Sequence, residues 1–222
     1  HVGKGYLDVI TKQVNHGSYR ILTTDENVTY STIASKAHDA LEYITMASDT
    51  HLRVDDGEVP NLRTSQVKAE GTATLDLEDD TTLVVDASTA AKVAAGSTVT
   101  LQMQTDTPTT RASIGGLSGA TVNVTGSGVL DLGSAQHTIT TLNITGATVY
   151  SNQSGAGGFN AHNAVNVNAG GTLQLDNVDA MGYGGGCTAS INLQGTADAH
   201  AVLELGGRQT AQGTVITMNG NA

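Results

Sequence analysis

A short motif, an asparagine between two aliphatic residues, recurs four times in the second half of the chain and strongly constrains the fold. Thr121-Val122-Asn123-Val124-Thr125-Gly126 returns 20 residues later as Thr141-Leu142-Asn143-Ile144-Thr145-Gly146. Looser copies, Val165-Asn166-Val167 and Ile191-Asn192-Leu193, follow after a further 23 and 26 residues. A second apolar pattern follows each copy: Leu130-Asp131-Leu132, the residues around Val149, Leu173-Gln174-Leu175 and Leu203-Glu204-Leu205. A period of 20–26 residues, built from short strands and glycine-containing turns, is typical of a stacked solenoid.

The alternation within the motif indicates which side chains face inward. In a strand, the two aliphatic residues point to one face and the asparagine points to the other. When copies stack at ~4.8 Å, the asparagines form an outer column, and the inner column consists of Val122, Leu142, Val165 and Ile191. The sequence therefore predicts a mainly β protein with a parallel β-helix, or β-solenoid-like, repeat region. A β-sandwich is the alternative, although hairpins do not require the same triplet to recur in phase.

The chain changes character near residue 110. Residues 1–110 hold 24 of the 31 Asp, Glu, Lys and Arg residues, whereas 21 of the 27 glycines lie in residues 111–222. We therefore expect a small mixed α+β module over residues 1–95 and the solenoid-like region over residues 96–222, cut from a longer polypeptide at its C-terminal end. Within the first module, apolar spacing predicts a helix over residues 33–47 and a second, short helix over residues 88–95.

The charge balance limits the partners of the chain. With 21 acidic and 10 basic residues, the formal net charge is -11, and phosphate contacts require Lys and Arg. Nucleic acid is therefore not an expected partner, and neither is an anionic lipid surface. No apolar run approaches the ~18 residues of a membrane-spanning helix, so we expect no membrane insertion. A single cysteine, Cys187, excludes an internal disulfide.

Three apolar segments next to glycines accompany the asparagine motifs: Gly128-Val129-Leu130-Asp131-Leu132-Gly133, Gly170-Gly171-Thr172-Leu173-Gln174-Leu175 and Ala201-Val202-Leu203-Glu204-Leu205-Gly206. Together with abundant Gly, Asn and Thr, they make residues 96–222 resemble the passenger domains of bacterial autotransporters and related surface proteins with β-strand repeats. The resemblance implies a secreted or surface-displayed protein of Gram-negative bacteria that acts as an adhesin or carries an appended enzyme. It implies no particular catalytic residue.

Candidate catalytic residues come from the acidic clusters of the first half. Paired carboxylates suit glycoside hydrolysis or aspartic proteolysis, and the preferred candidates are Asp55, Asp56 and Glu58, because a tight turn at Gly57 would bring their carboxylates together. The same turn would suit Ca²⁺, which takes oxygen ligands; no other cofactor is expected. The histidines lack the paired spacing of a zinc site, and Asp-Thr-Gly and Asp-Ser-Gly do not occur. Catalysis therefore stays an open question.

The few aromatic residues suggest a binding surface. Tyr150, Phe159 and Tyr183 lie in or beside glycine-rich stretches, and exposed aromatic side chains serve as anchors in recognition. The alternative is that these rings fill gaps in the stack.

We expect a fragment of a secreted bacterial surface protein, an adhesin or scaffold that binds host glycans or glycoproteins such as mucin. The alternative function is a secreted, carboxylate-dependent protease or glycosidase that acts on a mucin-type glycoprotein. A third hypothesis is that the repeats form a purely structural stalk.

Overall fold

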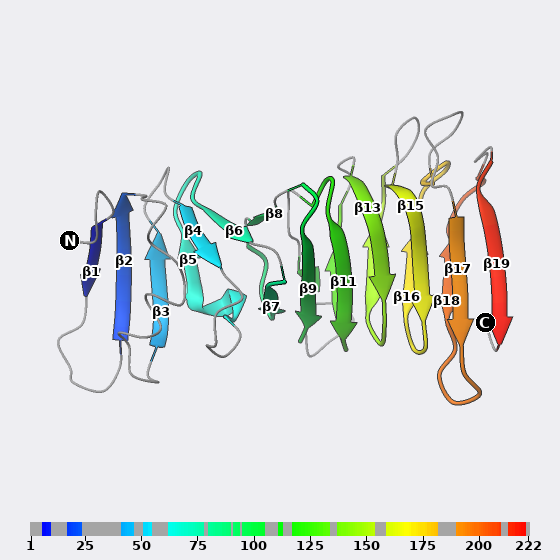
Figure 1. Cartoon of the computed structure of the whole chain (residues 1–222), viewed down its shortest axis with the longest axis horizontal. Helices are drawn as coiled ribbons and strands as arrows, with labels where there is room; N and C mark the ends of the chain where they lie inside the picture. The colour runs from blue at the N-terminus through cyan, green and yellow to red at the C-terminus, as the bar shows by residue number, and fades with distance from the viewer. Residues whose placement is uncertain are drawn as a thin grey trace.

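The computed structural model describes residues 6–9, 17–23, 41–46, 51–54, 62–77, 80–89, 91–93, 95–104, 111–112, 117–133, 137–153, 159–181, 190–209 and 213–220. Nearly all regular structure in these residues is β-strand, and their helical structure is one 3-10 turn, η1 (Thr64–Gln66). The strands lie side by side along one long axis, from the N-terminal to the C-terminal end (Figure 1). The predicted mainly β, solenoid-like architecture is confirmed.

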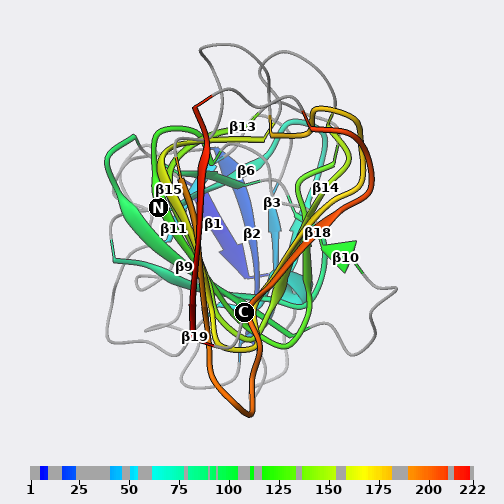
Figure 2. The same cartoon turned by 90° about the vertical axis from the view of Figure 1, so that its right-hand side faces the viewer.

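Two parallel sheets form the longest walls of the solenoid. The seven-stranded sheet has the order β19-β17-β15-β13-β11-β9-β7; its strands are β7 (Thr82–Val85), β9 (Thr98–Met103), β11 (Thr121–Gly126), β13 (His137–Ile144), β15 (Phe159–Asn168), β17 (Ser190–Gly195) and β19 (Val215–Gly220). The five-stranded sheet contains β10 (Arg111–Ala112), β12 (Val129–Asp131), β14 (Thr148–Ser151), β16 (Thr172–Leu175) and β18 (Val202–Leu205). Seen along the axis, the two sheets enclose the interior (Figure 2).

Two smaller sheets occupy the N-terminal part. One contains β4 (His51–Val54), β6 (Thr74–Leu77) and β8 (Ala91–Val93), all parallel. The other has the order β1-β2-β3-β5, with β1 (Tyr6–Val9), β2 (Gly17–Thr23), β3 (Leu41–Met46) and β5 (Val67–Ala69). In this sheet β1 pairs with β2 in antiparallel orientation, and the other pairs are parallel.

Both predicted helices are wrong where the structure describes them. Residues 41–46 form strand β3, which pairs with β2 on one side and β5 on the other; this pairing outweighs the helical spacing of the segment. Residues 91–93 form β8, where Ala91 and Val93 are buried and Lys92 is exposed. The predicted boundary between residues 95 and 96 stays a prediction, while β7 pairs in parallel with β9 on either side of it.

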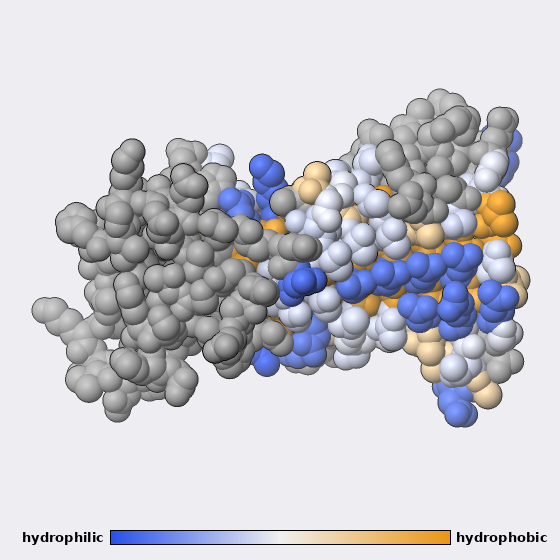
Figure 3. All heavy atoms as spheres, viewed as in Figure 1, coloured by the Kyte–Doolittle hydropathy of each residue, from blue (hydrophilic) through white to orange (hydrophobic). Residues whose placement is uncertain are grey.

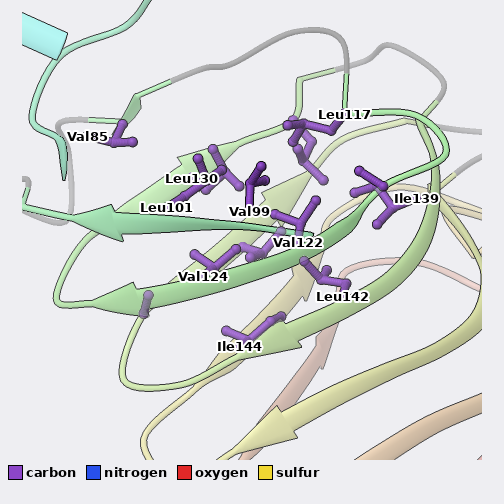
Figure 4. Packing of buried hydrophobic residues seen from close by; sticks show 14 of the residues in the cluster. Val85, Val99, Leu101, Leu117, Val122, Val124, Leu130, Ile139, Leu142 and Ile144 are labelled. Carbon is purple, nitrogen blue, oxygen red and sulfur yellow. The ribbon is translucent and has the colours of Figure 1, made fainter. Parts of the chain in front are cut away.

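The repeat aligns in the predicted register. Val122 lies beside Leu142, Leu142 beside Val165, and Val165 beside Ile191, and all four side chains are 0% exposed. A second inner column consists of Val124, Ile144, Val167 and Leu193. Side chains from β9, β11 and β13 gather in one layer (Figure 4). The buried hydrophobic residues form one cluster that extends from Met46 to Ala201, so a single core runs along the described stack.

Glycines make the turns between the two long walls. Gly126 ends β11 with φ +92°, and Gly146 follows β13 with φ +73°, a backbone conformation that favours glycine. A Cβ on Gly146 would lie 2.8 Å from the carbonyl oxygen of Gly126, and a Cβ on Gly126 would collide with the carbonyl oxygen of Met103. The recurring glycine therefore lets successive turns stack as closely as the strands do.

The carboxylate of Asp86 joins the end of β7 to η1. It accepts hydrogen bonds from Ser65 N and Ser65 Oγ, each at 2.8 Å, and from Thr64 Oγ1 at 3.0 Å. Arg63 Nη1 lies 3.6 Å from the same carboxylate. Thr64 Oγ1 accepts hydrogen bonds in return from the backbone N–H groups of Asp86 and Ala87. The two segments are therefore held by a reciprocal network.

This network predicts a pH dependence of stability. Burial raises the pKa of Asp86, but the hydrogen bonds from Ser65 and Thr64 lower it further than burial raises it, so the pKa lies below its ordinary value. Because the folded pKa is depressed, the stabilisation is present above the unfolded value of about 3.9 and is lost as the pH falls through the folded pKa. We expect Asp86→Asn to reduce the loss of stability on acidification below about pH 5.

Urea unfolding midpoints measured across this pH range test the prediction. Asp198→Asn, at an exposed aspartate in the turn after β17, is the control and should keep the wild-type pH dependence. Identical profiles for wild type and Asp86→Asn would contradict the proposed role of the carboxylate.

Candidate binding surface

The outward side chains of the seven-stranded sheet form a regular polar surface. We call the outward side chains of β9, β11, β13, β15, β17 and β19, with Thr145 in the turn after β13, the asparagine face. Its central column is set by strand register and consists of Thr100, Asn123, Asn143, Asn166, Asn192 and Thr217. A hydrophilic stripe accordingly runs along the solenoid axis on the front of the C-terminal half of the molecule (Figure 3).

Hydrogen bonds link the asparagines of this column from strand to strand. Asn143 Nδ2 donates to Asn123 Oδ1 at 2.8 Å, and Asn166 Nδ2 donates to Asn143 Oδ1 at 2.7 Å. Asn192 Nδ2 donates to Asn166 Oδ1 at 2.8 Å, and Asn123 Nδ2 lies 3.5 Å from Thr100 Oγ1. All the amides therefore point in the same direction along the axis, which gives the surface a fixed polarity.

The asparagine ladder leaves hydrogen-bonding capacity on its outer side. A primary amide has two N–H donors, and its oxygen has two acceptor positions. The link to a neighbouring asparagine uses one donor and one acceptor of Asn143 and of Asn166. Each of these half-buried side chains thus keeps one donor and one acceptor for a partner, repeated at the strand spacing of ~4.8 Å.

Columns of small polar residues flank the ladder. Thr98, Thr121 and Thr141 are aligned on one side. On the other side, Gln102 is aligned with Thr125, and Asn168 Nδ2 donates to Thr145 Oγ1 at 3.2 Å. The result is a surface of hydroxyl and amide groups with a two-dimensional repeat.

The asparagine face is uncharged although the chain is strongly acidic. Over their described lengths, its six strands contain no Asp, Glu, Lys or Arg, whereas the net charge of the chain is -11. The five-stranded sheet differs, since it carries Arg111, Asp131 and Glu204. A neutral, repeating polar surface suits a neutral partner that forms many hydrogen bonds.

Most of the site residues predicted from sequence lie outside the described residues. Asp55, Asp56, Glu58 and Tyr183 lie outside the described residues, as does Cys187. Phe159 is the first residue of β15, but the structure does not describe its side chain. Tyr150 lies in β14, on the five-stranded sheet, and is 8% exposed, which agrees with the alternative that this ring fills a gap in the stack. Ligand binding by these three aromatics stays a prediction.

Two further properties concern metal binding and membranes. Among the described residues, no group of three or more His, Cys, Asp or Glu side chains is placed to hold a metal ion. The Ca²⁺ turn predicted around Asp55, Asp56 and Glu58 falls outside this region. The described part of the chain also contains no helix with the length and hydropathy needed to cross a membrane.

Comparison with protein families, curated proteins and solved structures finds no match to this chain. The resemblance to autotransporter passenger domains therefore rests on the repeat segments of the sequence and stays a prediction.

The alternation of residues in the motif predicts that the asparagines lie outside the solenoid, but an outward asparagine does not by itself indicate a site. The informative signal was the lack of charge in every strand that carries the motif. Charged side chains are mostly solvent-exposed, and the described strands that carry the motif hold none, so their outer face is polar but uncharged.

Proposed function

We propose that this chain is part of a secreted bacterial surface protein, an adhesin or scaffold that binds glycans or glycoproteins through the asparagine face. The observation that carries the proposal is the uncharged ladder of Asn123, Asn143, Asn166 and Asn192 with the threonines beside it. Sugar hydroxyl groups both donate and accept hydrogen bonds, as do the amide and hydroxyl groups of this face. An extended, rigid sheet also holds these groups in place before binding, which lowers the entropy cost of recognition.

The hydrolase alternative gains no support from the described residues. Its candidate acids, Asp55, Asp56 and Glu58, lie outside them, and the asparagine face carries no carboxylate in its strands. We therefore take binding as the primary function, with an extracellular location and a glycoprotein such as mucin as the expected partner.

A pair of matched substitutions tests the site. Thr141 and Thr172 are both half-buried threonines at outward positions, but Thr141 lies on the asparagine face and Thr172 on the five-stranded sheet. Thr141→Glu places a hydrated charge on the flat surface, so we expect it to weaken binding to an immobilised mucin-type glycoprotein by about tenfold or more. Thr172→Glu should bind as the wild type does.

Surface plasmon resonance measures the affinity of both variants for the immobilised glycoprotein. Circular dichroism and thermal unfolding confirm that each variant is folded. Binding that survives removal of the glycans from the target, or that responds equally to both substitutions, would refute glycan binding at this face. Gel analysis of the target in the same experiment detects hydrolysis, and released fragments would favour the enzyme alternative.

A further inference from the structure

We infer that the asparagine face binds an uncharged, linear polysaccharide that lies parallel to the solenoid axis. This inference rests on the proposed glycan-binding function and specifies the class of glycan and its direction on the surface.

The direction follows from the shape of the repeat. Along a strand the face is narrow, since β11 presents only Thr121, Asn123 and Thr125 outward. Along the axis the central column continues through six strands, from Thr100 to Thr217, which corresponds to about 24 Å at the usual strand spacing. A ligand that contacts the whole column must therefore be elongated and run across the strands.

The spacing favours a polymer with one sugar ring per strand. Each strand from β11 to β17 adds one amide to the column, at intervals of ~4.8 Å, which is close to the length of one pyranose ring in an extended chain. β-1,4-linked pyranose chains are flat ribbons that repeat their hydroxyl groups along their edges. Successive rings of such a chain are rotated by about half a turn, so one edge presents a hydroxyl group at every strand and an equivalent one at every second strand. A compact branched glycan reaches fewer strands.

The charge pattern favours a neutral polymer. Recognition of carboxylate or sulfate groups uses Arg and Lys, and the described strands of this face contain neither. The net charge of -11 also repels an anionic polymer at long range. An uncharged hexose or N-acetylhexosamine chain needs no Arg or Lys for recognition and is not repelled by the negative charge of the protein.

The nature of the contacts predicts a dependence on ligand length. Tyr and Trp are absent from the strands of this face as described, so Asn and Thr groups supply most of the contacts. Each hydrogen bond of this kind contributes modestly, and linked contacts on one ligand reinforce one another. Affinity should therefore increase with every sugar that reaches another strand, until the column is filled.

Isothermal titration of the full chain with β-1,4-linked glucose di-, tetra- and hexasaccharides tests this inference. We expect the affinity to rise by about tenfold or more from the di- to the hexasaccharide. Oligogalacturonate of the same length should bind at least about tenfold more weakly than the neutral hexasaccharide. Asn143→Ala/Asn166→Ala removes two adjacent amides and should largely abolish the increase with length.

The control is Thr148→Ala/Thr172→Ala, at two positions that lie side by side on β14 and β16 of the other wall; it should retain the wild-type length dependence. Because the loss of two ladder amides also affects stability, Thr141→Glu, which leaves the asparagines in place, is tested beside it and should lower the hexasaccharide affinity.

The outcomes separate this inference from the proposed function. Mucin binding that is lost in Thr141→Glu, combined with no length dependence or with tighter binding of oligogalacturonate, would overturn the inference and leave glycan binding intact. Absence of binding to mucin and to every oligosaccharide would overturn both. Shaping of ice crystals by the wild type but not by Thr141→Glu, without sugar binding, would assign the face to ice and also overturn both.

Discussion

Replacing Leu142 by alanine is expected to lower the free energy of unfolding by about 2–5 kcal/mol. Leu142 is 0% exposed and lies in the inner column between Val122 and Val165. The backbone on both sides is fixed by parallel pairing with β11 and β15, so the walls cannot collapse into the space left by the side chain. The loss therefore includes both the transfer of the removed methyl groups and the cavity that remains.

Chemical denaturation monitored by circular dichroism measures this effect. Thr141→Ala is the matched control, since it truncates the neighbouring outward side chain of the same strand, and it should cost no more than about 1 kcal/mol. Equal losses for the two variants would contradict the assignment of Leu142 to the core and Thr141 to the outer face.

The second large effect is expected at a turn, where Gly146→Ala should destabilise the fold more than Gly133→Ala. Both glycines have positive φ, +73° and +61°, so each substitution pays the left-handed penalty of about 1–2 kcal/mol. At Gly146 the new Cβ would lie 2.8 Å from the Gly126 carbonyl oxygen, whereas a Cβ added to Gly133 would have no heavy atom within 4 Å apart from its chain neighbours. The crowding should add about 1–3 kcal/mol.

Thermal and urea unfolding of the two variants give the comparison directly. Because the backbone conformation is similar at both positions, the difference between them isolates the contact between successive turns. Losses of the same size would show that the turns tolerate a methyl group between them and that glycine is needed there only for its φ.

The part of the fold that could be predicted from sequence is the part with a repeated pattern. The offsets of 20, 23 and 26 residues between asparagine motifs are the register of β11, β13, β15 and β17. Such a pattern is readable because inward and outward residues alternate with a period of two. The triplets stay aligned although the offsets are unequal, so the differences in length fall between the triplets.

The N-terminal part was harder to predict because its pairing partners are not visible in the local sequence. Residues 41–46 have apolar spacing compatible with a helix, yet they form β3 between β2 and β5, and the partner β5 begins only at Val67. Spacing within one segment carries no information about such distant partners. The same limit applies to Ala91–Val93, whose partner β6 precedes it by a turn and another strand.

The residues of the candidate site could be predicted from the sequence, but their role as a binding surface could not. The sequence shows that asparagines recur in phase, but the strand-to-strand hydrogen bonds between their amides depend on side-chain rotamers that no sequence pattern fixes. Tyr150 shows the same limit for aromatic residues, because it is 8% exposed although it lies in register with the polar residues Asp131 and Gln174. Chemical type alone therefore did not distinguish a ring that packs from a ring that binds.

The alignment of the asparagine motifs also bears on how a surface of this kind could change in evolution. One period contributes one strand to each wall, as β13 and β14 do between β11 and β15. A duplication of one period would therefore lengthen the molecule by ~4.8 Å and add one amide to the column, without altering the inward or outward direction of any other side chain. The length of ligand that the asparagine face can contact would then change with the number of repeats, in uniform steps, without substitution of individual contact residues.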